Sequence, residues 1–400
     1  MGIANTTRDA RWYTYAMGFS LVPHGKKIVA LADIGGSGSA CALADAGNVP
    51  TQIQAVVRTP HVHEDRQGER TIAQLAQTLS TASSQLATMY TQPGISRPSE
   101  LYAIAHAPWI QSRSIVTERS FETETKITES LIGDMAKEAL AGDSSLVRED
   151  VCEGSVSHIE LNGYPTHAPH GKMAHHVKVV VLVSEMKRAH RDELEHALRP
   201  SFPEIPIRWR SYARALASVL GERGSESRNA VIFDISDDGS AVSVLRKNVL
   251  TEQKQIAAGT QTLLSLIAGK GSREETLSLL SMLEHGTCTT AQCDEINAAL
   301  TEAEPAITKI VGQGLGDMAA QRRLPNEAYL FMHEDLAEWF ARFIARIDFA
   351  QFTISSKPFS VHPLSVADFS HAVAWNAGVA HDLGIALAAA LVHTELHKNS

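Results

Sequence analysis

The sequence has little of what marks nucleic-acid binders and membrane-spanning proteins. Its 36 lysines and arginines are outnumbered by 45 aspartates and glutamates, which gives a net charge of −9 at neutral pH. It has no basic stripe of the kind that neutralises nucleic-acid phosphates. No stretch approaches the roughly 18–20 apolar residues that a membrane-spanning helix needs. We therefore expect a soluble protein with no nucleic-acid partner.

Cysteine is also scarce. Only four cysteines occur in 400 residues, namely Cys41, Cys152, Cys288 and Cys293. These are too few for a disulfide framework, so we expect reduced thiols in an intracellular protein. His285, Cys288 and Cys293 have a spacing loosely like that of zinc ligands, but a fourth ligand is not evident. Core thiols and a capped helix end are the favoured interpretation.

The first 25 residues lack the cleavage site of a secretory signal. Residues 12–22 are fairly apolar and follow Arg8 and Arg11, but no small-residue cleavage site precedes Pro23. We expect residues 1–25 to form an arm that docks on the body of the protein or on a partner. Together with the reduced thiols, this predicts a cytoplasmic protein.

One strand–loop–strand pattern occurs twice in the sequence. Two apolar segments, residues 27–33 and 40–45, flank a loop rich in glycine and serine. The same arrangement returns at residues 230–246. When Asp33 is aligned with Asp234, five of eight positions are identical, in the pattern Asp-Ile-x-x-x-Gly-Ser-Ala. This repeat predicts an internally duplicated fold.

The first loop has the residue types that a phosphate-binding turn needs. Glycines let the backbone approach a ligand closely and adopt positive φ, and successive N–H groups then form a concavity that binds anions. Serine hydroxyls add further donors. Asp33, at the end of the strand, could hold a hydrated magnesium ion. The loop residues that would bind phosphate are Gly35, Gly36, Ser37, Gly38 and Ser39.

The second loop carries the same elements in altered form. Gly239 and Ser240 repeat the end of the first loop, and Asp234 would be the second carboxylate beside the magnesium ion. However, Asp237 and Asp238 put acidic side chains where phosphate oxygens would lie, and like charges repel one another. The simpler alternative for both loops is a tight hairpin turn in which the aspartate caps backbone amides.

These loops resemble motifs of a known family. Residues 33–39 resemble the first phosphate motif of the bacterial actin homologues FtsA, which acts in cell division, and PilM, which acts in type IV pilus assembly. Residues 234–240 resemble their second phosphate motif in degraded form. Gly259 and Thr260 resemble the start of the glycine-led helix that follows in FtsA. The resemblance implies binding of ATP and Mg²⁺ at these residues, with the two aspartates beside the metal.

The resemblance also implies an α/β fold with two lobes, each built on a ribonuclease-H-like half-domain. Actin and the Hsp70 chaperones carry an insertion between the third strand and the helix, where this chain has only residues 60–68. Here the insertion follows the fourth predicted strand, where FtsA and PilM carry a small strand–helix interaction subdomain. We therefore expect an arm at 1–25, a first half at 26–108 and 203–225, an inserted subdomain at 109–202, and a second half at 226–400 with a helical insertion at about 259–320.

The inserted subdomain has the pattern of a small sheet. Residues 156–161 and 175–184 are predicted to be paired strands, joined through an Asn-Gly turn. The second strand is nearly continuous in valine and leucine, so we expect it to be buried on both faces. A small sheet with one helix on a face leaves an edge that can accept a strand from another chain. The alternative is that this subdomain only stiffens the first lobe.

The adenosine-binding position departs from the family pattern. The family has a glycine pair directly after a strand of the second lobe, where residues 330–335 of this chain contain no glycine. Bulky side chains there would obstruct the purine, so we expect at most weak ATP binding and no efficient ATPase activity. The favoured function is an FtsA/PilM-like assembly or scaffold protein of cell division or type IV pilus biogenesis. The alternative is a small-molecule kinase or phosphatase of the same superfamily, although no catalytic base for hydroxyl transfer is evident.

The resemblance implies protein partners from the division or pilus machinery, and self-association into protofilaments. FtsA adds a basic amphipathic membrane helix at its carboxyl end, whereas residues 383–391 of this chain are simply apolar. We therefore expect membrane association only through a partner or the N-terminal arm, at the inner face of the cell membrane.

Overall fold

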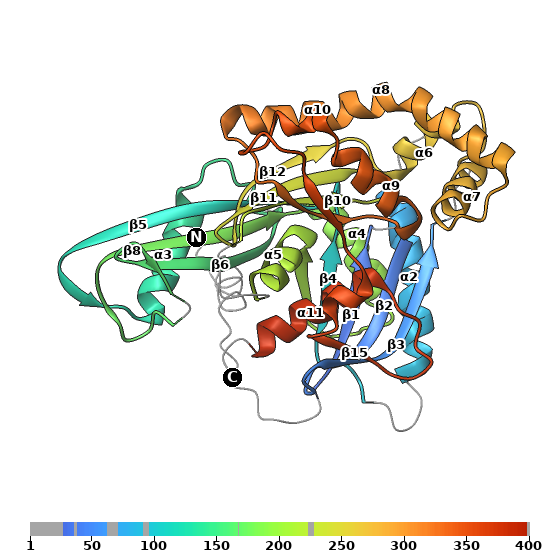
Figure 1. Ribbon diagram of the computed structural model, residues 1–400. Helices are drawn as coiled ribbons and strands as arrows, with labels where there is room; N and C mark the ends of the chain where they lie inside the picture. Colours follow the sequence, from blue (N-terminus) through green and yellow to red (C-terminus); the bar gives the residue numbers. More distant parts are fainter. Residues whose placement is uncertain are drawn as a thin grey trace, which may run out of the picture.

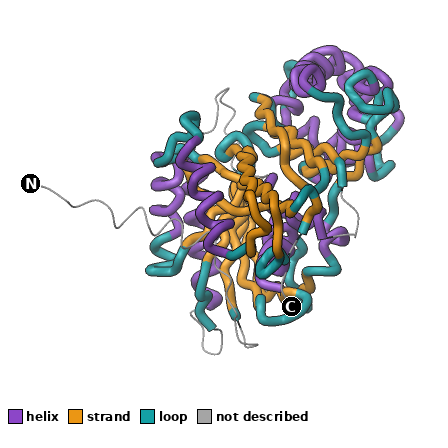
Figure 2. Tube along the Cα trace, turned by 90° about the vertical axis from the view of Figure 1, so that its left-hand side faces the viewer, coloured by secondary structure: helices purple, strands orange, loops and turns teal. Residues whose placement is uncertain are grey.

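The computed structural model describes residues 27–35, 38–61, 71–90, 96–166, 168–222 and 228–397. The predicted arm at residues 1–25 lies outside this range, as do Gly36 and Ser37 of the first loop. The described chain forms two large sheets and a smaller third sheet, which projects from the body of the molecule (Figure 1). In Figure 2 the strands form the interior and the helices flank them. The α/β architecture with two lobes is the one that the sequence predicts.

The first sheet is a meander extended by parallel strands. In spatial order its strands are β15 (Val373–Trp375), β3 (Thr51–Pro60), β2 (Gly38–Asp45), β1 (Ile28–Ile34), β4 (Leu101–Ala105) and β9 (Ile207–Ser211). Its faces are covered by α2 (Ile72–Tyr90) and α4 (Arg188–Leu198) on one side, and by α5 (Tyr212–Glu222) and α11 (Leu383–His397) on the other.

Successive side chains of β1 point alternately to the two faces of this sheet, and both faces are covered by helices. Val29 and Leu31 pack in the cluster that contains α5 and α11, whereas Ile28 and Ala30 pack in the cluster that contains α2 and α4. A strand with both faces buried must be apolar at every position, as β1 is before Asp33. Each fully buried valine or leucine contributes about 1.5–3 kcal/mol.

The second sheet repeats the pairing of the first. Its strands are β12 (Val249–Ile256), β11 (Ser240–Arg246), β10 (Ala230–Ile235), β13 (Glu327–Phe331) and β14 (Ser360–Pro363). β10 pairs antiparallel with β11 and parallel with β13, as β1 does with β2 and β4. The predicted internal duplication is confirmed at the level of strand pairing.

Helices form the rest of the second lobe. They are α6 (Thr260–Ala268), α7 (Arg273–Glu284), α8 (Thr290–Gln321), α9 (Glu334–Ile344), α10 (Ile347–Ala350) and the 3₁₀ helix Val366–Phe369. The helical character predicted for residues 259–320 is confirmed, because α6, α7 and α8 fill this segment. α8 runs along the outer side of the lobe (Figure 1) and is capped by Thr289 and Gln292 in a capping box.

The inserted segment forms the third sheet. Its strands, in spatial order, are β5 (Gln111–Lys126), β8 (Met173–Glu185), β6 (Val151–Leu161) and β7 (Tyr164–Pro165), with α3 (Glu129–Gly142) on one face. The predicted pairing of two strands is confirmed, because β6 runs antiparallel to β8 with Val156 opposite Val181. Residues 179–184 of β8 are buried on both faces, as predicted. β5 lies at one edge of this sheet.

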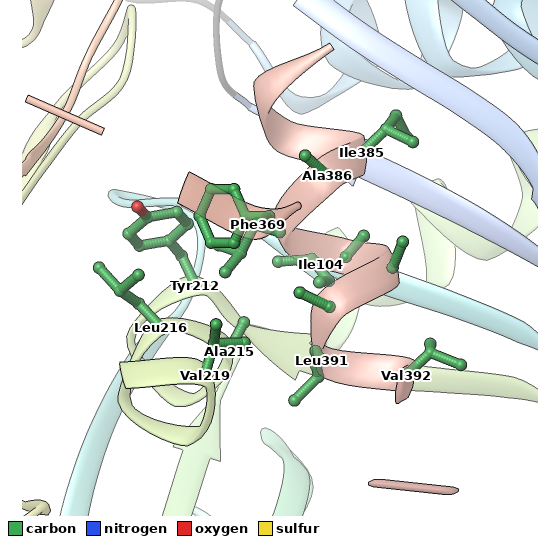
Figure 3. Packing of buried hydrophobic residues seen from close by; sticks show 14 of the residues in the cluster. Ile104, Tyr212, Ala215, Leu216, Val219, Phe369, Ile385, Ala386, Leu391 and Val392 are labelled. Carbon is green, nitrogen blue, oxygen red and sulfur yellow. The ribbon is translucent and has the colours of Figure 1, made fainter. Parts of the chain in front are cut away.

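The last part of the chain returns to the first sheet. β15 pairs in parallel with β3, and α11 packs on β1, β3 and α5. Figure 3 shows Leu391 and Val392 of α11 gathered with Ile104 and with Leu216 of α5. This differs from the sequence prediction, which assigned residues 226–400 to the second half. α11 is apolar on all sides, so it has no stripe that indicates which sheet it covers.

Two cysteines correct the prediction of reduced thiols. Cys288 and Cys293 form a disulfide across the start of α8, with their Cα atoms 5.6 Å apart. Cys41 and Cys152 are free. Burial raises the pKa of Cys41 to about 12, so this thiol is an unreactive core group. The described residues contain no group of three or more histidines, cysteines or acids placed to hold a metal ion.

A helix that crosses a membrane has to be both long and apolar. In the described ranges, none is both long enough and apolar enough to cross a membrane.

Candidate functional site

The two strand-end aspartates lie at equivalent places in the two lobes. Asp33 is opposite Ile104 where β1 pairs in parallel with β4, and Asp234 is opposite Phe331 where β10 pairs in parallel with β13. Ligands of α/β proteins bind outside the carboxyl ends of parallel strands. Both aspartates are nevertheless buried, at 1% and 4% exposure.

A histidine joins the two carboxylates. His106 follows β4 directly, and its backbone N–H donates to the carbonyl of Ile34. Its Nε2 lies 2.8 Å from Oδ1 of Asp33, and its Nδ1 lies 2.7 Å from Oδ1 of Asp234. The ring is completely buried and stacks on Tyr212 and Phe331, with centroid distances of 4.6 and 5.1 Å. One imidazole therefore connects the first lobe with the second.

The geometry requires a charged imidazole. A ring nitrogen bonded to an ionised carboxylate must donate, and both nitrogens donate only in the imidazolium form. Burial alone would lower the pKa of His106, but the charges of Asp234 and Asp33 and their hydrogen bonds raise this pKa to about 10. Burial alone would raise the pKa of Asp33, but His106 and Arg58 lower it to about 2. Both groups are ionised at neutral pH.

A second cation holds the other side of Asp33. Nη2 of Arg58, on β3, lies 2.8 Å from Oδ2 of Asp33 and 2.9 Å from Oδ1 of Asp382. Asp382 also accepts from the backbone N–H of Ile385 and so caps α11. A Cβ on Gly384 would lie 2.3 Å from Cγ of Asp33. The carboxylate of Asp33 is thus enclosed by His106, Arg58 and the first turn of α11.

The described residues at the two ends of the first predicted phosphate loop are closely packed against protein groups. Gly35 has a φ of +96°, and a Cβ there would lie 2.9 Å from Cδ1 of Trp109. Gly38 has a φ of +149°, and a Cβ there would lie 2.5 Å from the carbonyl oxygen of Thr59. The Ser39 hydroxyl is bonded to the Thr78 hydroxyl at 3.0 Å. The glycines at 35 and 38 are therefore required by close contacts within the protein itself.

The second predicted phosphate loop packs on the segment after His106. The Ser236 hydroxyl donates to the carbonyl of Ala107, and a Cβ on Gly239 would lie 3.0 Å from Cδ of Pro108. The Ser240 hydroxyl donates to the carbonyl of Ala258. The contacts with Ala107 and Pro108 place the chain of the first lobe against this loop, whereas the bond to Ala258 lies within the second lobe.

The start of α6 is occupied by the same loop. The N–H groups of Thr260 and Gln261 donate to the carbonyls of Ser236 and Asp237, at 2.8 and 3.3 Å. A Cβ on Gly259 would lie 2.4 Å from both of these carbonyl oxygens. Free N–H groups at a helix start can bind phosphate, but here the first two are already satisfied.

The arrangement does not fit a magnesium nucleotide. The two predicted metal carboxylates are bonded to an imidazolium, and the amides of α6 are bonded to loop carbonyls. The centre has three carboxylates and two cations. The carboxylates belong to Asp33, Asp234 and Asp382, and the cations are His106 and Arg58. A triphosphate would therefore meet excess negative charge. At the adenosine position the chain continues from Phe331 to His333, whose side chain accepts from the N–H of Asp335 at the start of α9. The two cations of the described centre are each bonded to two carboxylates, His106 to Asp33 and Asp234 and Arg58 to Asp33 and Asp382.

The sequence did not identify the residues at the middle of this centre. His106, Arg58 and Asp382 were not among the candidates, although Asp33 and Asp234 were. One signal could have found His106. It directly follows a strand predicted to run parallel to β1, and the carboxyl ends of parallel strands meet at one edge of a sheet. Arg58 and Asp382 have no such signal, because they are 324 residues apart.

Comparisons with known proteins identify the fold. No protein-family model matches the sequence. No curated protein matches it either. A chain of the PilM–PilN type IV pilus biogenesis complex has a similar structure, with a TM-score of 0.59 at 14% identity over 94% of this chain and 99% of that one.

Two other solved structures align at lower similarity. The ethanolamine utilization protein EutJ of Carboxydothermus hydrogenoformans is 10% identical, with a TM-score of 0.44 over 94% of this chain and 92% of that one. Component A of the (R)-2-hydroxyglutaryl-CoA dehydratase of Acidaminococcus fermentans is 8% identical, with a TM-score of 0.40 over 93% and 99%. The similarity to the chain of the PilM–PilN complex, over nearly the whole length of both, shows that this chain has the two-lobed actin-like fold.

Proposed function

We propose that this chain is an actin-fold assembly or scaffold protein of type IV pilus biogenesis or cell division. In this proposal it acts by binding protein partners, and it does not turn over ATP efficiently. The observation that carries the proposal is the bonding of Asp33 and Asp234 to His106 in the buried interior between the lobes, where an actin-fold ATPase would need them for a metal. The similar PilM chain was solved in a complex named for two proteins, PilM and PilN, which agrees with a binding role.

The inserted subdomain is the proposed docking surface. Among the described residues, the outer side of its edge strand β5 pairs with no other strand of its own sheet. Near its start, however, β5 contacts β12 of the second lobe, where the Ser112 N–H donates to Oε1 of Gln253, so the free part of this edge lies beyond that contact. Such an edge can accept a strand from another chain. Four of the six large apolar side chains that are exposed in the described part of the chain lie in this subdomain, namely Val116, Val147, Tyr164 and Met173. Exposed apolar side chains are frequent at sites of protein association.

Point variants on this surface test the docking proposal. Val116→Asp lies in β5, at the proposed edge, and Tyr164→Asp lies in β7, at the opposite edge of the same sheet. Their side chains are 54% and 77% exposed, so both variants should fold normally, and together they show which edge binds the partner. Ile354→Asp, at a site that is 61% exposed outside the subdomain, is the matched control. We expect the first two to weaken partner binding at least about tenfold, which corresponds to about 1.4 kcal/mol. The control should leave binding unchanged.

Candidate partners can be sought among the products of the genes that neighbour the one encoding this chain. Pilus inner-membrane proteins and a tubulin-like division protein are the two classes that the proposal names. Pairwise binding can be measured by two-hybrid assay and by co-purification, and self-association by analytical ultracentrifugation. Binding that is equal in all three variants would reject the docking surface. Membrane association, in this proposal, occurs at the inner face of the cell membrane through such a partner.

Nucleotide binding provides the test of the non-enzymatic role. We expect calorimetric titration with ATP and Mg²⁺ to give weak binding at best. A dissociation constant for ATP below about one micromolar, or ATP turnover at about 1–10 per second, would contradict the proposal. ATP turnover that depends on a small-molecule substrate and is lost in Asp33→Ala would instead favour a kinase or phosphatase.

A further inference from the structure

Two buried carboxylates, one from each lobe, meet at His106, where an actin-fold ATPase would hold a metal. Asp33 comes from β1 of the first lobe, and Asp234 comes from β10 of the second. Both carboxylates lie at the carboxyl ends of central strands, and both point at the same imidazole. Two buried carboxylates that face one site repel each other unless a cation lies between them. In the described structure that cation is the His106 ring.

Every element around the ring supports a fixed positive charge there. β1 and β10 supply the two carboxylates, at 2.8 and 2.7 Å. α5 supplies Tyr212 and β13 supplies Phe331, whose rings stack on the imidazole. Aromatic faces attract cations, so both contacts favour the charged ring. Arg58 bonds Asp33 from the other side, and Asp382 in turn bonds Arg58.

The ring also takes the position that a bridging metal would need. A hydrated divalent cation between the lobes has to reach both carboxylates, but Oδ1 of each is already within hydrogen-bond distance of a ring nitrogen. Pro108 and Ala107 close the second loop from the same side. The metal and the ring cannot both occupy this place.

We propose that His106 is a built-in cation that substitutes for the metal and nucleotide of the actin-like cleft and holds the two lobes together without a ligand. Two consequences follow. The wild-type protein gains no stability from Mg²⁺ or from Mg²⁺ with ATP. Removal of the ring leaves two facing carboxylates, and these create a binding site for a divalent cation that the wild type does not have. The inference does not depend on which partner the inserted subdomain binds.

The test compares thermal unfolding of the full chain and three variants in EDTA, in millimolar Mg²⁺ and in millimolar Mn²⁺. His106→Ala removes the ring, and His106→Gln keeps a neutral polar group of similar size. We expect both to unfold at lower temperature than wild type in EDTA, and to regain about 2–4 °C when the metal is added. His158→Ala, which removes a histidine 3.1 Å from Glu160 in the inserted sheet, is the matched control and should show no metal effect.

A second substitution shows where the metal binds. Asp234→Asn in the His106→Gln background removes one of the two carboxylates, so the metal effect should disappear. Stabilisation of the wild type by Mg²⁺ with ATP would overturn the proposal, as would the absence of any metal effect in His106→Gln. If His106→Ala does not fold, His106→Gln and the wild-type titration still decide the outcome.

Discussion

Two hairpins with the same sequence pattern each direct an aspartate at His106, yet the two aspartates have different neighbours. Asp33 has both carboxylate oxygens bonded to cations, Oδ1 to His106 and Oδ2 to Arg58. Asp234 has one oxygen bonded to His106, and its other oxygen accepts only a long bond of 3.4 Å from the N–H of Ala107. The repeated motif fixes where each carboxylate lies, and elements distant in the sequence decide what it binds.

The loops that follow the two aspartates also close in different ways. Gly38 contacts Thr59 of its own sheet, whereas Gly239 contacts Pro108, which belongs to the other lobe. The first loop is therefore stabilised within one lobe, and the second helps to hold two lobes together. A shared pattern of glycine and serine can thus serve packing within a sheet in one place and an interface between lobes in another.

The largest expected effect is a difference in stability between variants of the two aspartates. Asp33→Asn leaves Arg58 with only Asp382 and leaves His106 with only Asp234, so we expect a loss of about 3–5 kcal/mol in the free energy of unfolding. Asp234→Asn leaves His106 with only Asp33 and weakens just a long bond from the N–H of Ala107, so it should cost about 2–3 kcal/mol. Urea denaturation of both variants measures the difference. Equal losses would mean that Arg58 contributes nothing to the centre.

The next effect tests the contact between the second loop and α6. Gly259→Ala puts a methyl group against the carbonyl oxygens of Ser236 and Asp237, which belong to the rigid backbone. We expect a loss of about 3 kcal/mol in the free energy of unfolding. Gly142→Ala is the control, because a Cβ there meets nothing within 4 Å. A loss in the control as large as in Gly259→Ala would show that the close contact is not the cause.

The dependence of stability on pH sharpens the role of the shared histidine. The pKa of His106 is raised to about 10, so its contribution is fully present below its unfolded pKa of about 6.5 and is lost as pH rises through about 10. In that window the unfolded state binds fewer protons, and stability falls by at most about 1.4 kcal/mol per pH unit. The lowered pKa of Asp33 has the opposite effect at acidic pH, where the free energy of unfolding decreases as pH falls below about 3.8 towards 2.

The variant His106→Gln isolates the alkaline part of this profile. Its stability, measured by urea denaturation between pH 6.5 and 10, should lack the slope that His106 contributes to wild type. His158→Ala should keep the wild-type slope. Parallel profiles for wild type and His106→Gln would contradict the assignment of the slope to His106.

The smallest expected effect compares the two serines that end the loops. Ser240→Ala leaves the buried carbonyl of Ala258 without the hydroxyl that donates to it, so we expect a loss of about 1–2 kcal/mol. Ser39→Ala removes a bond to the Thr78 hydroxyl, which still donates to the carbonyl of Leu75, and should cost about 0.5–1 kcal/mol. Chemical denaturation resolves the two. The reverse order would show that the first loop depends more on its hydroxyl.

Much of the fold could be predicted from local patterns. The apolar run of β1, the near-continuous valines of β8 and the repeated Asp-Ile-x-x-x-Gly-Ser-Ala motif each specify a strand or a turn from neighbouring residues alone. Burial on both faces demands apolar residues at every position, and that demand is visible in the sequence. Fold class and strand pairing within each hairpin followed from such signals.

The tertiary structure alone decided which residues surround Asp33 and Asp234. His106 meets Asp33 across 73 residues and Asp234 across 128, and Arg58 meets Asp382 across 324. Contacts over such distances leave no periodic signal, because each requires only one polar residue at the end of an otherwise ordinary element. The same reason applies to α11, whose uniformly apolar surface fits either sheet. The sequence by itself determined two hairpins that each end a strand with a carboxylate, and the folded chain determined that a histidine lies between them.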